Sequence, residues 1–437
     1  MDAYTTDEPI YALATPYAPS AIAVVRTSGD NAIEMISRAF SGAKRLLKAE
    51  NATLVHGRLR DASGSDVDEV VLAVYRKGHG YTGEEAVEIN AHGSLRGLDR
   101  IFRLLEELGF RKAKKGEFTY RAFMHGRLDL TQAEAVEELI SAKSESVQAA
   151  ALDRLEGSLK KKLQDIRKRL LMMSASLEVQ LDYAEDEILE DWVMPTEELD
   201  AIISELSRIR ATYDASALWR EGAKVVLAGE TNAGKSSLFN LLTKEERAIV
   251  SPVRGTTRDY LEADTMIHGI PVRLYDTAGL RESDDEIEME GIRRSERLIR
   301  EADLVLYLVA PGDSEEVLWD TPTITVRTKS DLSRGEGLSV SVKNGEGLDE
   351  LLDEIKRRLT EGRGDFSSSV IIDSERQKDT LDRLLSQLEF LVSHGNESYD
   401  IIALFFQSAL SVLGEITGEV TSEELLDTLF SNFCLGK

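Results

Sequence analysis

The chain has almost no cysteine and little proline. Cys434 is the only cysteine among 437 residues, which excludes an intrachain disulfide and indicates a reducing compartment, expected to be the cytoplasm. Only 8 prolines occur, and none lies between Ser20 and Met194. This stretch is therefore free to form long helices, since proline interrupts a helix interior.

A long apolar run and an amino-terminal targeting pattern are also missing. Residues Met1 to Pro9 are polar and acidic, without the basic start and apolar core of a signal peptide. The longest apolar candidate, Asp303–Ala310 (DLVLYLVA), has the length of a buried strand. A membrane-spanning helix needs roughly 20 apolar residues, so no membrane association is expected.

Positive charge is in deficit. The chain has 53 Lys and Arg against 79 Asp and Glu, a net charge of −26. Such a chain repels nucleic acids, whose phosphates attract basic proteins by counterion release. If RNA is the substrate, a basic partner or a local patch must hold most of it. The basic run Lys160–Arg169 (KKKLQDIRKR) is interpreted as a solvated helix face, with an RNA-contact patch as the alternative.

Four zones follow one another along the chain. The first mixes strand-like runs, such as Ala21–Arg26 and Glu69–Arg76, with helical ones, such as Gly97–Phe110, which is an α+β pattern. In the second, apolar residues from Leu152 to Leu177 recur every three or four positions, as in helices. From about Gly222 strands and helices alternate, which predicts a mostly parallel sheet flanked by helices. After about residue 372 helical patterns return.

These zones predict a multidomain chain. We expect an α+β amino-terminal domain (1–118), an all-α helical domain in two parts (119–219 and 372–437), and an α/β domain (220–371) inserted between them. An independent carboxy-terminal helical domain is the alternative.

The segment Gly229–Ser236 (GETNAGKS) matches the phosphate-binding pattern GxxxxGK[ST]. It follows a predicted strand and precedes a helix, so backbone amides and the helix amino terminus would surround phosphates. Lys235 would bridge the β- and γ-phosphates, and Ser236 would bind Mg²⁺. A P-loop nucleotide hydrolase is therefore predicted.

Three further motifs specify the nucleotide. Thr257, in RGTTRD, is a second Mg²⁺ ligand candidate, and DTAG (Asp276–Gly279) would meet the metal's water shell and the γ-phosphate. Asp331, in TKSD, can accept two hydrogen bonds from guanine that adenine cannot supply. The nucleotide is therefore predicted to be GTP. Many GTPases have asparagine where Thr328 stands, and the lost hydrogen bond would cost roughly 1 kcal/mol.

Two positions bear on hydrolysis. Leu280 follows DTAG, where Ras-like switches place the glutamine that orients the attacking water, so another group must act here. Asn232 occupies the position at which some GTPases use asparagine to help bind a potassium ion that replaces an arginine finger. A local turn residue is the alternative for Asn232.

Several segments together indicate a family. Ala23–Gly29 (AVVRTSG), Tyr81–Gly93 (YTGEEAVEINAHG), Gly116–Ile140 (GEFTYRAFMHGRLDLTQAEAVEELI), DTAGLR and a terminal CLGK resemble the MnmE (TrmE) family of tRNA-modification GTPases, within the TrmE-Era-EngA-like GTPases. The resemblance runs from end to end. Thr231, where many members have proline, and Thr328 depart from the family pattern.

The resemblance implies a function and partners. Members work with the flavoprotein MnmG to form a 5-carboxymethylaminomethyl or aminomethyl group on the wobble uridine of certain tRNAs. The one-carbon unit comes from 5,10-methylene- or 5-formyltetrahydrofolate, and FAD enters only through MnmG. The resemblance further implies a folate-binding-like amino-terminal domain that forms a homodimer, a heterotetramer with MnmG, and tRNA held largely by MnmG.

The resemblance also implies site residues. For folate it implies Arg26, Glu88, Arg127 and the terminal Lys437, with Glu84 as an alternative to Glu88 and a plain surface carboxylate as the alternative for each acid. Potassium would be bound by Asn232, Ser251, Val253 and Thr256, and magnesium by Ser236 and Thr257. The full set of predicted GTP-binding residues is Asn232, Ala233, Gly234, Lys235, Ser236, Ser237, Ser251, Pro252, Val253, Arg254, Gly255, Thr256, Thr257, Asp276, Thr277, Ala278, Gly279, Thr328, Lys329, Asp331 and Ser341.

Catalytic roles are implied for three residues. Lys235 would stabilise the transferred phosphate, and Glu288 would position the catalytic water indirectly, although one acid in so acidic a run is as readily a solvated side chain. Cys434 is a candidate nucleophile, because thiolates attack electrophilic carbons well. A structural or redox-labile thiol is the alternative for Cys434.

The sequence leaves two rival functions open. One is a regulatory GTPase switch in ribosome or RNA assembly, which would leave the folate-like domain and the CLGK end unexplained. The other is a folate-dependent aminomethyltransferase in which the GTPase is only regulatory.

Overall fold

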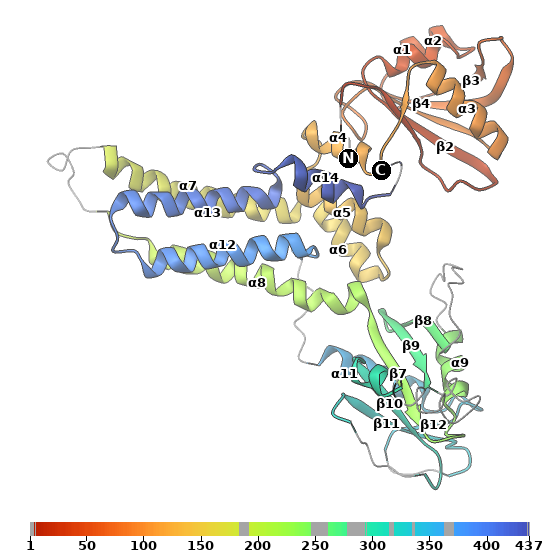
Figure 1. The fold of residues 1–437 in the computed structure, drawn as a ribbon, viewed down its shortest axis with the longest axis vertical. Helices are drawn as coiled ribbons and strands as arrows, with labels where there is room; N and C mark the ends of the chain where they lie inside the picture. Colours follow the sequence, from red (N-terminus) through yellow and green to blue (C-terminus); the bar gives the residue numbers. More distant parts are fainter. Residues whose placement is uncertain are drawn as a thin grey trace. The chain divides into compact units, whose positions relative to one another are not determined.

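The computed structural model describes residues 4, 6–182, 192–245, 261–277, 293, 295–313, 319–333, 337–361, 371–434 and 436 (Figure 1). The chain divides into two compact units. The first comprises Met1–Glu137, Arg154–Asp200 and Asp379–Lys437, and the second comprises Glu138–Asp153 and Ala201–Lys378. Each unit therefore combines segments that lie far apart in the sequence.

A six-stranded sheet opens the first unit. Its order is β3-β4-β5-β2-β1-β6, and all neighbours are antiparallel except β1 and β6. The strands are β1 (Ile10–Leu13), β2 (Ser20–Ser28), β3 (Thr53–Arg60), β4 (Asp66–Tyr75), β5 (Ala86–Gly93) and β6 (Arg111–Lys112). The two strands predicted from the sequence are confirmed as β2 and β4, each a few residues longer than expected.

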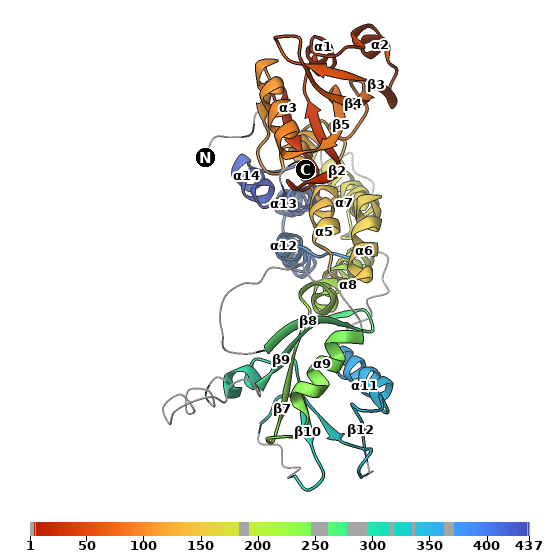
Figure 2. The same ribbon diagram turned by 90° about the vertical axis from the view of Figure 1, so that its right-hand side faces the viewer.

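Helices cover one face of this sheet. These are α1 (Ala32–Ser37), α2 (Ala43–Lys48) and α3 (Leu95–Glu107). Their apolar residues, such as Ile33, Leu46 and Ile101, form one core with alternate strand residues, such as Val25 and Leu72 (Figure 2). Because strand side chains alternate between faces, the intervening residues of β2 and β5 point to the other face.

Helix α4 (Glu117–Met124) lies on that other face, beside β1. Phe118 packs there with Ile10, Ala12 and Ala113, in contact with the partly buried Tyr81. Helix α4 thus covers the β1 edge of this face. Next to Ala12 of β1, the β2 residue on the same face is Arg26. This arrangement positions the amino-terminal site described below.

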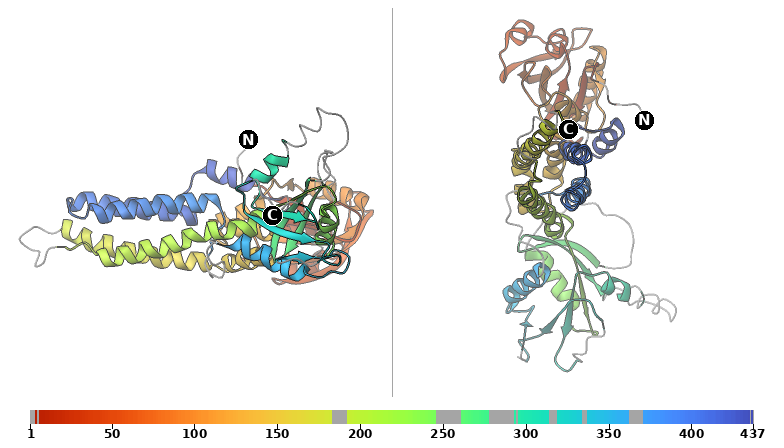
Figure 3. Two further views of the ribbon diagram at one scale, coloured as in Figure 1. Left: turned by 90° about the horizontal axis from the view of Figure 1, so that it is seen from below. Right: turned by 90° about the vertical axis from the view of Figure 1, so that its left-hand side faces the viewer.

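Helices make up the rest of the first unit. They are α5 (Leu130–Ser141), α7 (Ser158–Asp182), α13 (Tyr399–Thr417) and α14 (Glu423–Ser431), while α8 (Thr196–Glu221) and α12 (Glu375–Ser393) begin in one unit and end in the other. Helix α7 packs along α13, so segments before and after the α/β part of the chain lie side by side (Figure 3).

The apolar stripe from Leu152 to Leu177 is not one continuous helix. Helix α6 (Glu145–Leu155) ends before Gly157, whose φ of +89° stops the helical path, and α7 begins at Ser158. Within α7 the stripe is buried as expected, whereas Leu152 is 45% exposed. The periodicity concealed the break because the apolar residues keep their spacing of three or four positions across it in the sequence.

Helix α13 qualifies as a membrane span by length and composition, with 19 residues and a mean hydropathy of 1.4 in its most apolar window. It does not stand out in the sequence as an unbroken apolar run, because polar residues such as Gln407 and Ser408 interrupt it. In the structure 44% of that window is buried, and α7 packs against the helix.

The second unit contains a six-stranded sheet of order β12-β11-β10-β7-β9-β8, parallel except for β8. Its strands are β7 (Ala223–Gly229), β8 (Leu261–Ile267), β9 (Ile270–Asp276), β10 (Leu304–Val309), β11 (Thr323–Thr328) and β12 (Ser339–Val340). Helices α9 (Lys235–Glu245) and α11 (Leu348–Thr360) cover one face (Figure 2). The mostly parallel sheet is confirmed, while the antiparallel strand β8 was not foreseen.

The fold class predicted from the sequence is therefore confirmed. It consists of an α+β amino-terminal domain, a helical domain, and an α/β P-loop domain whose strand β7 leads directly into the phosphate-binding segment.

Candidate functional site

The phosphate loop, residues 229–236, connects β7 to α9. Asn232 and Gly234 have positive φ values of 63° and 96°, so the backbone turns back on itself here. Gly229 has a φ of 143°, and a Cβ on it would lie 2.3 Å from the carbonyl oxygen of Leu308 in neighbouring β10. No larger residue fits at Gly229, which lets the loop start close to the sheet.

The polar side chains of this loop converge at the ends of β7 and β9. Lys235 is buried, and its Nζ donates to the carbonyl oxygens of Gly229 and Glu230 at 2.8 Å each. Ser236 Oγ donates to Asp276 Oδ2 at 2.7 Å. A hydroxyl and a carboxylate at this spacing are hard oxygen donors of the kind Mg²⁺ prefers. The ammonium and the helix amino terminus supply positive charge for phosphates.

The segment expected to recognise the base lies against the phosphate loop. Thr328 is buried at the end of β11, and its Oγ1 donates to the carbonyl oxygen of Ala233 at 2.7 Å. Asp331 is exposed, and the fully buried Ser341 donates its hydroxyl to Asp331 Oδ1 at 3.1 Å. The carboxylate that would discriminate guanine is therefore held in place by a second loop.

Part of the predicted nucleotide site cannot be placed. Outside the described residues lie Ser251, Pro252, Val253, Arg254, Gly255, Thr256, Thr257, Ala278, Gly279, Leu280 and Glu288. The potassium site and the residue that positions water therefore stay predictions. Of the potassium set only Asn232 is described. Thr277, at the end of β9, donates its hydroxyl to the carbonyl of Leu227 at 2.8 Å.

A second site lies on the open face of the amino-terminal sheet. Arg26 of β2 and Glu88 of β5 are directly paired across the strands, and Arg26 Nε donates to Glu88 Oε1 at 2.9 Å. The Arg26 guanidinium lies 5.7 Å from the ring centroid of Tyr81 and 5.9 Å from that of Phe118. Both side chains of the pair are about one-fifth exposed, at 20% and 24%, so they are held in position yet accessible.

The carboxy-terminal tail reaches this pair. The carbonyl oxygen of Gly436 accepts a hydrogen bond from Arg26 Nη1 at 3.2 Å. Gly436 has a φ of +89°, and a Cβ on it would lie 2.6 Å from the carbonyl oxygen of Leu13 in β1. Glycine at this position thus allows the tail to run close to the sheet. Lys437 lies outside the described residues, so its folate role stays a prediction.

An aromatic cluster anchors the tail upstream. Phe430 of α14 and the following Phe433 are buried with Leu130 of α5, and Tyr4 and Tyr120 pack on the cluster. The Gly116 amide donates to the carbonyl of Cys434 at 3.4 Å. The Cys434 side chain is exposed. Its role as a nucleophile stays a prediction.

The structure separates the alternatives Glu84 and Glu88. Glu84 is 7% exposed, accepts two hydrogen bonds from Arg121 Nη1 at 3.1 and 3.2 Å, and a third from Ser28 Oγ at 2.6 Å. These contacts occupy its carboxylate. Glu88 is the more accessible of the two for a ligand, while Arg127 is exposed on the loop after α4.

Sequence reasoning did not single out Tyr81, Phe118 or Arg121. Burial raises the pKa of the Tyr81 hydroxyl, although its hydrogen bond with Thr119 and the charge of Arg26 oppose this effect. Tyr81 therefore lines the site as an uncharged side chain. The sequence signal that could have identified Arg121 was its charge, since it lies beside the apolar residues of GEFTYRAF.

Comparison with known proteins finds one family model for the amino-terminal part of the chain and another for the rest. Residues 9–127 match the family model described as GTP-binding protein TrmE N-terminus, and residues 130–434 match that of the MnmE helical domain. A tRNA modification GTPase MnmE of Treponema denticola is 41% identical over 467 residues, 99% of each chain. One of Aquifex aeolicus is 40% identical over 453 residues, covering 98% of this chain and 100% of the relative. The solved G domain of the T. maritima FeoB iron transporter covers 31% of this chain at 28% identity, with a TM-score of 0.25.

Proposed function

The chain belongs to the MnmE family of tRNA modification GTPases, and from this premise we propose that it acts with the flavoprotein MnmG on the wobble uridine of certain tRNAs. The pair would form the 5-carboxymethylaminomethyl or aminomethyl group on carbon 5 of that uridine. The chain itself is a GTP hydrolase. The observation that carries the proposal is the likeness to MnmE relatives over nearly the whole length of both chains.

The chemistry proposed for the second unit is K⁺-assisted GTP hydrolysis. Lys235 and the amides of the phosphate loop would bind the phosphates, and Ser236 with Thr257 would hold Mg²⁺, which neutralises charge on the β- and γ-phosphates. Asn232, Ser251, Val253 and Thr256 would hold potassium, and Glu288 would position the water indirectly. Asn232 lies at a left-handed turn of the phosphate loop, which suits this role and a local turn residue equally.

The potassium proposal has a direct test. Hydrolysis by the wild-type chain should be several-fold faster in KCl than in NaCl, because only the larger ion would fit the set that includes Asn232. Asn232→Ala should erase this difference, whereas Asn240→Ala, an exposed asparagine on α9, should keep it. Equal wild-type rates in the two salts would contradict potassium dependence.

For the amino-terminal site we propose a tetrahydrofolate derivative, 5,10-methylene- or 5-formyltetrahydrofolate. A folate offers hydrogen-bond donors on its pterin and carboxylates on its glutamate. Glu88 is an acceptor for the former, and Arg26 and Arg127 are cationic partners for the latter. The partly buried ring of Tyr81 beside Arg26 supports a planar ligand, and Lys437 would reach the site from the tail.

The proposed assembly is a cytoplasmic homodimer that joins MnmG in a heterotetramer. FAD would belong to MnmG alone. With a net charge of −26, the chain is poorly suited to hold tRNA itself, which supports MnmG as the main tRNA-binding partner.

Two measurements test the whole proposal. Isothermal titration of 5-formyltetrahydrofolate into the full chain should show binding, and a chain lacking residues 434–437 should bind it more weakly. Nucleoside analysis of tRNA from cells without the protein should show loss of the wobble-uridine modification. If the full chain did not bind the folate and the wobble uridines were unchanged in cells without the protein, a regulatory GTPase switch in RNA assembly would be favoured instead.

A further inference from the structure

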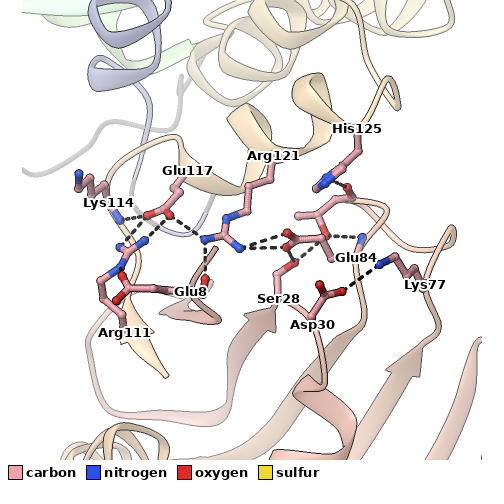
Figure 4. Close-up of polar contacts among 11 residues, drawn as sticks. Glu8, Ser28, Asp30, Lys77, Glu84, Arg111, Lys114, Glu117, Arg121 and His125 are labelled. Atoms are coloured by element: carbon pink, nitrogen blue, oxygen red, sulfur yellow. Dashed lines mark hydrogen bonds and ion pairs between the residues drawn. The ribbon is translucent and has the colours of Figure 1, made fainter. Parts of the chain in front are cut away.

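The amino-terminal domain contains a buried chain of alternating charges that the proposed chemistry does not use (Figure 4). At its centre is Arg121 of α4, with no exposed surface. Its Nη1 contacts both oxygens of Glu84, and its Nη2 donates to Glu117 Oε1 at 3.1 Å and to the carbonyl oxygen of Glu8 at 2.7 Å. Burying ions is costly unless they are paired and hydrogen-bonded, and Arg121 is paired with both Glu84 and Glu117.

Arg121 acts on a short loop, residues 81–84. Glu84 ends this loop and accepts the hydroxyl of Ser28 at 2.6 Å, and the same hydroxyl lies 2.7 Å from Thr82 Oγ1. His125 Nδ1 lies 3.0 Å from the carbonyl oxygen of Thr82. The loop is therefore attached to β2 on one side and to α4 and the residue that follows it on the other.

The loop contacts both arginines proposed for the folate, Arg26 and Arg127. Tyr81, at its start, has its ring beside the Arg26 guanidinium, and its hydroxyl lies 2.8 Å from Thr119 Oγ1 of α4. Gly83 lies against Arg127, since a Cβ on Gly83 would be 3.3 Å from Arg127 Cγ. A shift of this loop would therefore move the surroundings of Arg26 and Arg127 together.

We propose that Arg121 is a positioning residue for the ligand site of the amino-terminal domain. By pairing with Glu84, it fixes the loop 81–84 and with it the relative placement of Arg26 and Arg127, which set the fit of a ligand carrying carboxylates. The inference rests on the proposed folate function. Such a positioning residue matters because a displacement of about 1 Å among the groups that bind a ligand removes much of their contribution to binding.

Arg111 provides a matched control within the same network. It also binds the fully buried Glu117, with Nη2 at 2.7 Å from Oε1, and it contacts Glu8. Among the described residues, however, Arg111 contacts neither Glu84 nor the rest of the loop 81–84. Loss of Arg111 therefore weakens the shared network without releasing the loop.

The experiment compares 5-formyltetrahydrofolate binding with thermal unfolding for full-length variants. Arg121→Met combined with Glu84→Gln and Glu117→Gln removes the buried charges together, so that no carboxylate is left unpaired. Glu84→Gln alone is the milder second variant, because it keeps the shape of the side chain. We expect Kd to rise about tenfold in the triple variant and about threefold in Glu84→Gln, with cooperative unfolding in both, and to stay within about twofold in Arg111→Met.

The outcomes are distinct. If the Arg121 and Glu84 variants bind as the wild type does while their unfolding temperatures fall, Arg121 only stabilises the fold and the inference is wrong. If Arg111→Met weakens binding equally, the effect passes through the general stability of the domain, and the inference is also wrong. If the wild type itself does not bind the folate, the proposed folate function fails first.

Discussion

At the scale of single residues, Thr328 shows how a departure from a motif can be accommodated. Its hydroxyl donates to the Ala233 carbonyl in the phosphate loop at 2.7 Å and so connects the base-recognition segment to the phosphate-binding one. Thr328→Val should leave that carbonyl unsatisfied and weaken GTP binding by about 1 kcal/mol, or roughly fivefold in Kd. Fluorescence titration with a labelled GTP analogue would measure the change.

A second threonine provides the control for this prediction. Within the part of the chain that the structure describes, Thr243 donates to carbonyls of its own helix alone, those of Phe239 and Asn240 in α9. Thr243→Val should leave the Kd for GTP within about twofold of the wild type. Equal losses in both variants would show that Thr328 acts through general packing rather than through the phosphate loop.

Glu117 gives a pH-dependent prediction. Burial raises the pKa of its carboxyl, but hydrogen bonds from Arg111 and the Lys114 amide and the charge of Arg121 outweigh burial, so the pKa lies below its ordinary value. A carboxylate with a lowered folded-state pKa contributes stability that is complete above its unfolded pKa of about 4.3 and is lost as pH falls through the folded value.

The unfolding temperature of the wild type should therefore fall more steeply below about pH 4.5 than that of Glu117→Gln, which has no such group to titrate. At pH 7 the variant should be the less stable of the two. Thermal scans from pH 3 to pH 7, in a buffer series of constant ionic strength, would show it. Parallel curves across this range would contradict a stabilising role for ionised Glu117.

At the scale of secondary-structure elements, helix α14 holds the tail in place. Phe430 is fully buried, and its ring contacts those of Tyr4, Tyr120, Phe123 and Phe433. Phe430→Ala should cost about 3–5 kcal/mol of unfolding free energy, because it removes buried surface and leaves a cavity. Chemical denaturation of the full chain would measure this cost.

A neighbour on the same helix is the control. Thr428→Ala, at an exposed position of α14, should change the unfolding free energy by less than about 0.5 kcal/mol. If the Phe430 variant is equally mild, the aromatic cluster does not anchor α14. In that case the contact between Gly436 and Arg26 must be maintained by the tail alone.

At the scale of the whole molecule, the distribution of charge bears on the proposal that MnmG, rather than this chain, holds most of the tRNA. The basic run of α7 does not form an uninterrupted positive surface, since Lys160, Arg167 and Arg169 lie within 4 Å of Asp129, Glu419 and Glu198. Lys161→Glu with Lys168→Glu, both at exposed positions, should therefore leave wobble-uridine modification unchanged in cells. A folded variant that loses modification would establish this run as an RNA contact.

Motifs and periodicity were enough to predict several features of this protein. The phosphate loop, the alternation of strands and helices after Gly222, and the pairing of early and late helical segments are local or periodic signals, and they are confirmed. The break at Gly157 and strand β8 were missed, because apolar spacing that continues in the sequence hides a two-residue interruption and an antiparallel edge strand carries no motif.

The sequence by itself determined the fold class and the family of this protein, because composition, spacing and motifs act over short stretches of chain. Only the tertiary structure decided which of two glutamates stays accessible, since Glu84 is buried in a pair with Arg121, 37 residues away, whereas Glu88 stays partly exposed in its pair with Arg26. It also decided that Gly436 meets Arg26, 410 residues earlier in the chain. Such contacts depend on where distant elements pack, and burial and ion pairing between them leave no local signature in the sequence.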